Sequence, residues 1–304
     1  MIIKIYRTII PFSLRDKIYS LFLGDLLLIL RNLKPYLKGK SVYFFSFLFP
    51  KNDYYDAFRF IGKHGISFHA FPAALSYNDL PIKVLYDEAK CLPYVYHSNK
   101  KLYFPQNMEE ENIISLYRSL VLEQDSNSPH RYVDSYDELK GMFLLDIGAA
   151  EGIFSLEVIE LVEKTHLFEC DEKWIKALHA TFEPWKEKVL IVEKYISDIN
   201  NEEFTTIDSF MEEKENNNLF IKMDIEGYEQ SALRGARQTL DNGQNVVLSV
   251  CTYHRPNDAK EISFFLNSIG YQYSFTKGYL FCGKQMNRAV CRAKKSYKDL
   301  TGSL

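Results

Sequence analysis

The stretch FLLDIGAAEGIFSL, residues 143–156, decides the fold expected for this chain. An apolar run ends at Asp146, small residues follow from Gly148 to Gly152, and apolar residues then return at helical spacing. A strand, a tight turn and a helix in this order begin the cofactor site of many open α/β sheets, because small residues let the backbone approach a ligand closely. The stretch therefore predicts the first βα unit of a parallel sheet.

Predicted strands and helices alternate from residue 143 onward, which indicates a mostly parallel, doubly wound sheet covered on both faces. The strands are expected at 143–148, 165–171, 188–197, 219–224 and 245–254. The helices between them are expected at 154–164, 173–185, 229–240 and 259–270. Two last short strands, 271–276 and 279–283, are expected to form an antiparallel hairpin at one edge.

The residues before this sheet predict a smaller α+β region. We expect strands at 40–49 and 66–71, helices at 56–65 and 109–125, and a hairpin within 92–105. The resulting division is a basic amphipathic helical arm (1–40), a small α+β region with a hairpin (41–110) and a Rossmann-like domain (111–304).

Charge is unevenly distributed along the chain. The net charge of −3 argues against a nucleic-acid partner. Residues 1–40, however, hold eight basic and two acidic side chains, an excess of six positive charges. The apolar run LFLGDLLLIL (21–30) is too short to span a bilayer, so the arm is expected either to lie on a membrane surface or to pack on the main domain. Five scattered cysteines fit free thiols and a cytoplasmic protein, at the inner face of the membrane if the arm binds lipid.

The turn after the first strand does not match a dinucleotide site. That site needs glycines at i, i+2 and i+5, which here are Gly148, Ala150 and Ile153. Ile153 is too bulky for the close packing of helix and strand at the third position. The observed pattern is Asp-x-Gly-x-Ala-x-Gly, and its acid suits a ligand with positive charge, such as the ammonium and sulfonium of S-adenosylmethionine. The residues expected to hold this cofactor at the turn are Asp146, Gly148, Ala149, Ala150 and Gly152.

Acidic residues at the next strand ends complete the expected cofactor site. Glu169 follows Gly148 by about the 20 residues that separate the glycine turn from a ribose-binding acid. Asp171 is the rival, with Cys170 between them in the same predicted contact segment. Ser197 and Asp198, after the third strand, are expected to contact the adenine.

A second group of residues is expected where the chemistry would occur. Asp224 and Glu226 end the fourth strand, and His254 ends the fifth, so all three should face the crevice of the first turn. We expect His254 to be the base that takes a proton from an incoming hydroxyl, Asp224 to position cofactor or hydroxyl, and Glu226 to stand beside them. The three side chains could also hold Mg²⁺, but no diagnostic motif supports a metal, and none is predicted.

These segments together resemble the FkbM-type methyltransferases. The resemblance covers about 143–282 and is carried by LLDIGAAEGIFSL, FECDEKW, TIDSFM, FIKMDIEGYEQSALRGA and SVCTYHRPND. It is most specific at Lys222, Asp224, Glu226, Gly227, Glu229, Leu233 and Gly235. The segment EQDSNSPHRYV (123–133) also resembles the region before the domain in bacterial members associated with surface glycans.

The resemblance implies a class I fold, S-adenosylmethionine as cofactor and O-methylation of a hydroxyl on a sugar, glycan or glycolipid precursor. It matches the turn residues and Glu169 to the family's cofactor contacts, whereas Glu151 stands where members usually have Asn. Two other functions remain open at this point: a non-catalytic cofactor-binding or glycan-assembly protein, and a Rossmann oxidoreductase, which the missing third glycine disfavours.

Overall fold

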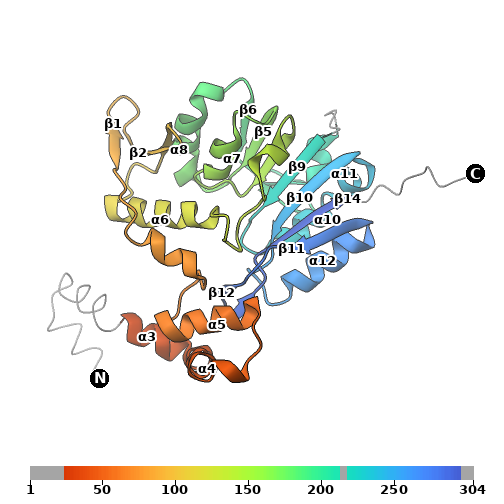
Figure 1. Cartoon of the computed structure of the whole chain (residues 1–304). Coiled ribbons are helices and arrows are strands. Elements are labelled where there is room, and N and C mark those ends of the chain that lie inside the picture. The colour runs from red at the N-terminus through yellow and green to blue at the C-terminus, as the bar shows by residue number, and fades with distance from the viewer. Residues whose placement is uncertain (1–23, 213–217, 296–304) are drawn as a thin grey trace, which may run out of the picture.

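The computed structural model describes residues 24–212 and 218–295, so much of the expected basic arm, residues 1–23, lies outside the description. Figure 1 shows a central sheet with helices on both faces and the first helices gathered at one end of the molecule. In the described ranges, no helix combines the length and apolar character needed to cross a bilayer.

The central sheet confirms the expected α/β class. Over residues 24–212 and 218–295 it has seven strands in the order β11-β14-β10-β9-β4-β5-β6. The strands are β4 (Phe143–Ile147), β5 (Lys164–Phe168), β6 (Val189–Val192), β9 (Asn218–Met223), β10 (Asn245–Cys251), β11 (Tyr271–Phe275) and β14 (Val290–Lys295). The chain runs outward from β4 to β6 and then returns to β9 on the other side of β4. This reversal places the expected ligand crevice at the carboxyl ends of β4 and β9.

The sheet has the expected antiparallel edge, but the expected pairing of 271–276 with 279–283 is wrong. β11 pairs antiparallel with β14, which in turn pairs antiparallel with β10. The segment 279–283 instead forms β12 (Leu280–Cys282), which pairs with β13 (Gln285–Asn287) in a separate ribbon. The position beside β10 is buried on both faces, and β14 fills it with Val290, Cys291 and Ala293, whereas Phe281 of β12 packs among the N-terminal helices.

Two apolar cores cover the faces of the sheet. One face packs α6 (Glu110–Glu123), α7 (Ile153–Val158) and α8 (Glu172–Phe182). The other packs α9 (Ile207–Met211), α10 (Glu229–Arg234), α11 (Arg237–Asn242) and α12 (Asp258–Ser268). Strand side chains alternate between these cores, as a pleated strand requires: Leu144 faces the first and Leu145 the second.

Two expected elements of this domain are broken in the structure. The helix predicted at 229–240 divides into α10 and α11 at Gly235, where an added Cβ would lie 2.0 Å from the carbonyl oxygen of Ser197. The strand predicted at 188–197 divides into β6 and β7 (Tyr195–Ile196), and β7 pairs with β8 (Phe204–Thr205).

The N-terminal region is more helical than expected. It comprises α3 (Gly24–Arg31), α4 (Leu33–Phe44), the 3₁₀ turn η2 (Ser46–Leu48), α5 (Asp53–His64), η3 (Pro72–Tyr77), β1 (Leu85–Asp87), β2 (Leu92–His97) and β3 (Lys100–Tyr103). Two more 3₁₀ turns, η4 (Tyr136–Leu139) and η5 (Glu183–Trp185), follow later in the chain. The expected helices at 56–65 and 109–125 are confirmed as α5 and α6, and the expected hairpin as β2 and β3.

The strands predicted at 40–49 and 66–71 are wrong. Residues 40–44 of the first segment continue α4, and the η2 turn follows them. Gly39 and Gly62 let α4 and α5 approach until an added Cβ on Gly62 would lie 2.2 Å from the Gly39 carbonyl oxygen. The second segment is irregular, and its Phe68 carbonyl accepts hydrogen bonds from Phe281 N at 3.0 Å and from Ala70 N at 3.2 Å. The domain boundaries at 40 and 110 stay predictions.

Candidate active site

The glycine turn (residues 148–152) lies directly against the end of β9. Gly148 has a φ of +79°, and a Cβ built there would lie 1.9 Å from the carbonyl oxygen of Asp224. Gly152 has a φ of +80°, and its Cβ would meet the ring of Phe182 at 2.7 Å. Both glycines are therefore required by contacts within the protein as well as by backbone conformation. A bulky side chain at Gly148 would collide with protein backbone before it reached a ligand.

A buried ion pair holds the start of this turn. Lys222 Nζ lies 2.9 Å from Asp146 Oδ1 and donates a hydrogen bond to the Gly148 carbonyl at 2.5 Å. Ser155 Oγ donates to the other oxygen of Asp146 at 2.6 Å. Asp146, which the sequence places toward a cationic cofactor, is thus 1% exposed and neutralised by Lys222. Through Lys222, which also binds the Gly148 carbonyl, Asp146 positions the turn.

Glu169 connects the end of β5 to the glycine turn. Its Oε2 accepts a hydrogen bond from Ala150 N at 2.8 Å, and its Oε1 accepts from Cys170 N and Asp171 N, both at 2.8 Å. A carboxylate offers about four acceptor positions, so one remains for a ligand hydroxyl. Asp171 instead caps α8 by accepting from Lys173 N at 3.1 Å. The structure thus favours Glu169 over Asp171 as the acid beside the turn.

The other expected cofactor contacts divide into two groups. Ala149 is buried and its N–H donates to the carbonyl of Phe168 at 3.0 Å, inside the turn. Ser197 and Asp198 bond instead to α10: Asp198 accepts from Ser231 Oγ at 2.6 Å and from Arg234 Nε at 2.8 Å. Contact of Ser197 and Asp198 with a cofactor stays a prediction.

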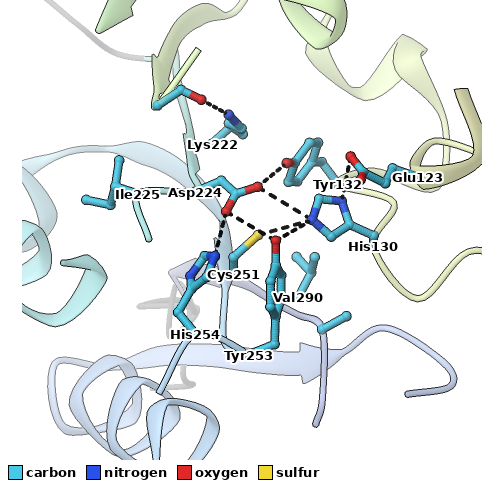
Figure 2. Close-up of polar contacts among 12 residues, drawn as sticks. Glu123, His130, Tyr132, Lys222, Asp224, Ile225, Cys251, Tyr253, His254 and Val290 are labelled. Atoms are coloured by element: carbon cyan, nitrogen blue, oxygen red, sulfur yellow. Dashed lines mark hydrogen bonds and ion pairs between the residues drawn. The ribbon is translucent and has the colours of Figure 1, made fainter. Parts of the chain in front are cut away.

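Asp224 is the centre of the polar site that Figure 2 shows. Its Oδ2 accepts a hydrogen bond from the Tyr132 hydroxyl at 2.9 Å and lies 3.5 Å from His130 Nε2. Its Oδ1 accepts from the Tyr253 hydroxyl at 3.4 Å and lies 3.3 Å from His254 Nε2. The carboxylate is therefore bracketed by two imidazoles, one from the fifth strand end and one from the segment before the sheet.

His254 is held from its other side by a glutamate. Its Nδ1 lies 2.8 Å from Glu229 Oε1, which also accepts from Ile225 N at 2.9 Å. Glu229 is fully buried. Glu226, with a φ of +54° and a side chain 92% exposed, stands outside with Oε2 3.7 Å from His254 Nε2. The structure brings together Asp224, His254 and, at the mouth, Glu226, as the sequence predicts.

His130 repeats this arrangement on the opposite side of Asp224. It is 1% exposed, its Nε2 is hydrogen-bonded to the Tyr253 hydroxyl at 3.0 Å, and its Nδ1 faces Glu123 Oε2 at 3.8 Å. The sequence assigns no role to Glu123, His130 or Tyr132, because their segment, EQDSNSPHRYV, offers only a helix end, a loop and a resemblance to the region before the domain in bacterial family members. We call Glu123, His130, Asp224, His254 and Glu229 the acid–histidine chain.

In the acid–histidine chain, each carboxylate and its neighbouring imidazole stabilise the charged form of the other. Burial, the strongest influence on both imidazoles, lowers their pKa values, but the facing carboxylates outweigh it and raise the pKa of His130 and of His254 above the usual value. Burial likewise works to raise the pKa of Asp224, but its hydrogen bond with His130 and the neighbouring positive charges hold that pKa well below its usual range. Asp224 is thus ionised at neutral pH.

Glu151, at the second-last position of the turn, has the opposite character. Its side chain is 6% exposed, and burial raises the pKa of its carboxyl to about 8. It therefore carries a proton at neutral pH and adds no charge to the site.

The donor atoms of the site do not match a magnesium centre. Among the residues that the structure describes, two groups are close enough to share an ion: His130, Asp224 and Cys251, and Asp224, Glu229 and His254. Mg²⁺ prefers six oxygen ligands in near-ideal octahedral geometry. Here nitrogen and sulfur stand among the donors, and the oxygens face imidazoles.

Methyltransferases of known structure resemble part of this chain. A search of curated proteins found no match. Methyltransferase FkbM from Methylobacillus flagellatus KT is 19% identical, with a TM-score of 0.40 over 62% of this chain and 56% of that one. Precorrin-6y C5,15-methyltransferase from Geobacter metallireducens GS-15 is 14% identical, with a TM-score of 0.36 over 53% of this chain and 85% of that one. A SAM-dependent methyltransferase from Aquifex aeolicus is 12% identical, with a TM-score of 0.39 over 62% of this chain and 100% of that one.

The family comparison is decisive. This chain matches only 56% of the length of the Methylobacillus protein, so the fold similarity by itself carries no activity over. The family model described as the methyltransferase FkbM domain, however, matches residues 54–273, well over half of the chain. The protein belongs to the FkbM methyltransferase-domain family.

Proposed function

We propose that this protein is an S-adenosylmethionine-dependent O-methyltransferase that acts on a hydroxyl of a sugar, glycan or glycolipid precursor. One observation carries the proposal. Gly148 of the glycine turn packs on the backbone of Asp224, so the cofactor turn and the acid–histidine chain form a single site. The family membership supports methyl transfer, and the resemblance described above supports the sugar or glycan acceptor.

The residues present fit the proposed cofactor. The left-handed backbone at Gly148, Ala150 and Gly152 keeps the turn compact, and Glu169 has an acceptor position left for ribose hydroxyls. S-adenosylmethionine supplies an activated methyl group on a sulfonium. Asp224, ionised and 19% exposed, lies against the turn through its backbone, and its charge suits a cationic ligand.

His254 is the base in this proposal. Its Nε2 takes the acceptor's proton, while Glu229 holds Nδ1 and fixes the direction of the ring. The same carboxylates raise the pKa of His254, so the imidazole becomes a base only as pH rises through a value above 6.5. Asp224 orients the ring, and Glu226 borders the entry.

A ligand-binding experiment tests the proposal. S-adenosylhomocysteine at about 100 times its Kd should stabilise the protein by about 2.7 kcal/mol and raise Tm by several degrees, while NAD⁺ at the same concentration should not. Crystals soaked with S-adenosylhomocysteine should then show its ribose beside Glu169. A Tm that rises with NAD⁺ and stays constant with S-adenosylhomocysteine would refute the proposal.

We also propose that the N-terminal arm contacts an anionic membrane surface. In the part of the arm that the structure describes, apolar side chains stand exposed beside basic ones. The exposed apolar residues from α3 to η2 include Leu26, Leu30, Leu33, Leu37, Phe44, Phe47 and Leu48. Apolar area and basic charge together produce binding to anionic lipid.

Liposome flotation tests this contact. The full chain should float with vesicles rich in phosphatidylserine and stay unbound with neutral vesicles. A chain lacking residues 1–23 should float less than the full chain. This deletion leaves α4 intact, which packs on α5 through Gly39 and Val42. Equal flotation with both vesicle types would leave packing on the main domain as the role of the arm.

A further inference from the structure

The acid–histidine chain does not end at Glu123. On the side of α6, the Ser119 hydroxyl donates a hydrogen bond to Glu123 Oε1 at 3.3 Å. The same hydroxyl is hydrogen-bonded to His69 Nε2 at 3.2 Å. Polar side chains therefore continue, one contact at a time, from Asp224 through His130, Glu123 and Ser119 to His69.

This continuation leads out of the active site. His69 and Ser119 both line a cavity of about 590 Å³, open on one side, between η3 and α6. None of the residues that line this cavity belongs to the cofactor turn or to the acid–histidine chain. The line of side chains thus connects the buried carboxylate of Asp224 with a separate opening on the N-terminal region.

Every member of the line can exchange a proton. Burial raises the pKa of Glu123 and, with the nearby charge of His130, lowers the pKa of His69 to about 4. His69 is therefore neutral at physiological pH. A neutral imidazole has one donor and one acceptor nitrogen, and a hydroxyl both donates and accepts. His69 Nδ1 is buried and has no hydrogen-bond partner among the described residues, so the ring must turn toward the cavity to pass a proton on.

Two contacts of the line, Asp224 with His130 and His130 with Glu123, are longer than the others. The gap of 3.5 Å between Asp224 and His130 is also bridged by the Tyr253 hydroxyl, which lies 3.0 Å from His130 Nε2 and 3.4 Å from Asp224 Oδ1. The gap of 3.8 Å between His130 Nδ1 and Glu123 Oε2 is an ion-pair contact, and proton transfer there requires the two groups to close to about 3 Å.

We propose that Asp224, His130, Glu123, Ser119 and His69 form the exit path for the proton that the acceptor hydroxyl loses. The proposal rests on the proposed function. In the transfer, the acceptor oxygen forms a bond to the methyl carbon, the carbon–sulfur bond breaks with its electron pair left on sulfur, and the hydroxyl proton passes to His254. The path returns that proton to solvent, so that the base is free for the next acceptor while the cofactor product still covers the crevice.

The experiment uses S-adenosylmethionine alone as the probe, so no acceptor is needed. The positive charge of S-adenosylmethionine bound at the turn would repel the protons of His130 and His254, whose pKa values the facing carboxylates raise. Binding should therefore expel a proton. Stopped-flow mixing in weak buffer follows that proton with a pH indicator, and the fluorescence of Trp174, on α8 just after Glu169, follows binding.

Ser119→Ala removes the hydroxyl that joins Glu123 to His69. Proton release should slow by about tenfold or more, binding of S-adenosylmethionine should stay unchanged, and added imidazole buffer should restore the rate, which a purely structural defect would not allow. Ser115→Ala is the matched control, because Ser115 lies one turn earlier on α6 and lines the same cavity. It should release the proton at the wild-type rate.

The outcomes separate the two proposals. Equal release rates in Ser119→Ala and Ser115→Ala, or binding without any proton release in the wild type, would overturn the exit path and leave the proposed function intact. Failure of the wild type to bind S-adenosylmethionine would refute the proposed function and the path with it.

Discussion

Replacing Glu169 by alanine should weaken S-adenosylhomocysteine binding by about 10- to 100-fold. The carboxylate accepts three backbone hydrogen bonds at 2.8 Å, from Ala150, Cys170 and Asp171, and offers its remaining acceptor position to the ribose. Hydrogen bonds to a charged group contribute about 1.5–3 kcal/mol, and each 1.4 kcal/mol changes Kd about tenfold. Isothermal titration calorimetry measures this loss directly.

Glutamine at this position should bind almost as poorly as alanine. Both oxygens of Glu169 accept from N–H groups, so a side-chain amide must point its NH₂ group at one of them. Asp171→Ala is the matched control: it removes the cap of α8, at a cost of about 1 kcal/mol in stability, and should leave affinity unchanged. Loss of affinity in Asp171→Ala with normal binding in Glu169→Ala would refute the assignment.

Three further predictions concern the turn and the base. Gly148→Ala should lower Tm more than Gly152→Ala, because its Cβ would lie 1.9 Å from backbone whereas the Gly152 Cβ would meet a movable ring at 2.7 Å; equal melting curves would contradict the packing described. Glu151→Gln should leave stability unchanged below pH 4.5 and become stabilising toward pH 8, by roughly 1.4 kcal/mol per pH unit, because the buried acid keeps its proton until about pH 8 while the unfolded chain loses it near pH 4.5. Urea unfolding at pH 4.5 and 7.5 checks this sign, and a constant difference would disprove it. His254→Ala should bind S-adenosylhomocysteine normally but lose about 100-fold in turnover, while wild-type turnover should rise with pH through a midpoint above 6.5 and be insensitive to EDTA. Near-normal turnover in His254→Ala would move the base to Asp224 or Glu226.

Local pattern was enough to predict the Rossmann-like part of the fold. The apolar run before Asp146, the small residues after it and the alternation of strands and helices are short-range features, set by backbone conformation and by burial of each strand on both faces. The same reasoning placed Asp224 and His254 in one crevice, since the carboxyl ends of neighbouring parallel strands meet at one edge.

Contacts between distant segments decided the rest. The aromatic run at 40–49 has strand propensity, yet residues 40–44 continue a helix that packs on α5 where Gly39 meets Gly62. Residues 290–295 form the strand beside β10, because that position must be buried on both faces. Only the fold places Lys222 2.9 Å from Asp146, the acid that the sequence assigns to a cationic cofactor.

The second half of the active site was visible only in three dimensions. His130 and Glu123 lie about a hundred residues before Asp224 in the chain, at the end of a helix and in the loop after it, and only tertiary packing brings them to the carboxylate. Periodicity reports which face of a helix or strand is buried. It carries no information about which distant polar group a buried histidine will meet, because that pairing is set by the geometry of the assembled core and by the need of each buried charge for a partner.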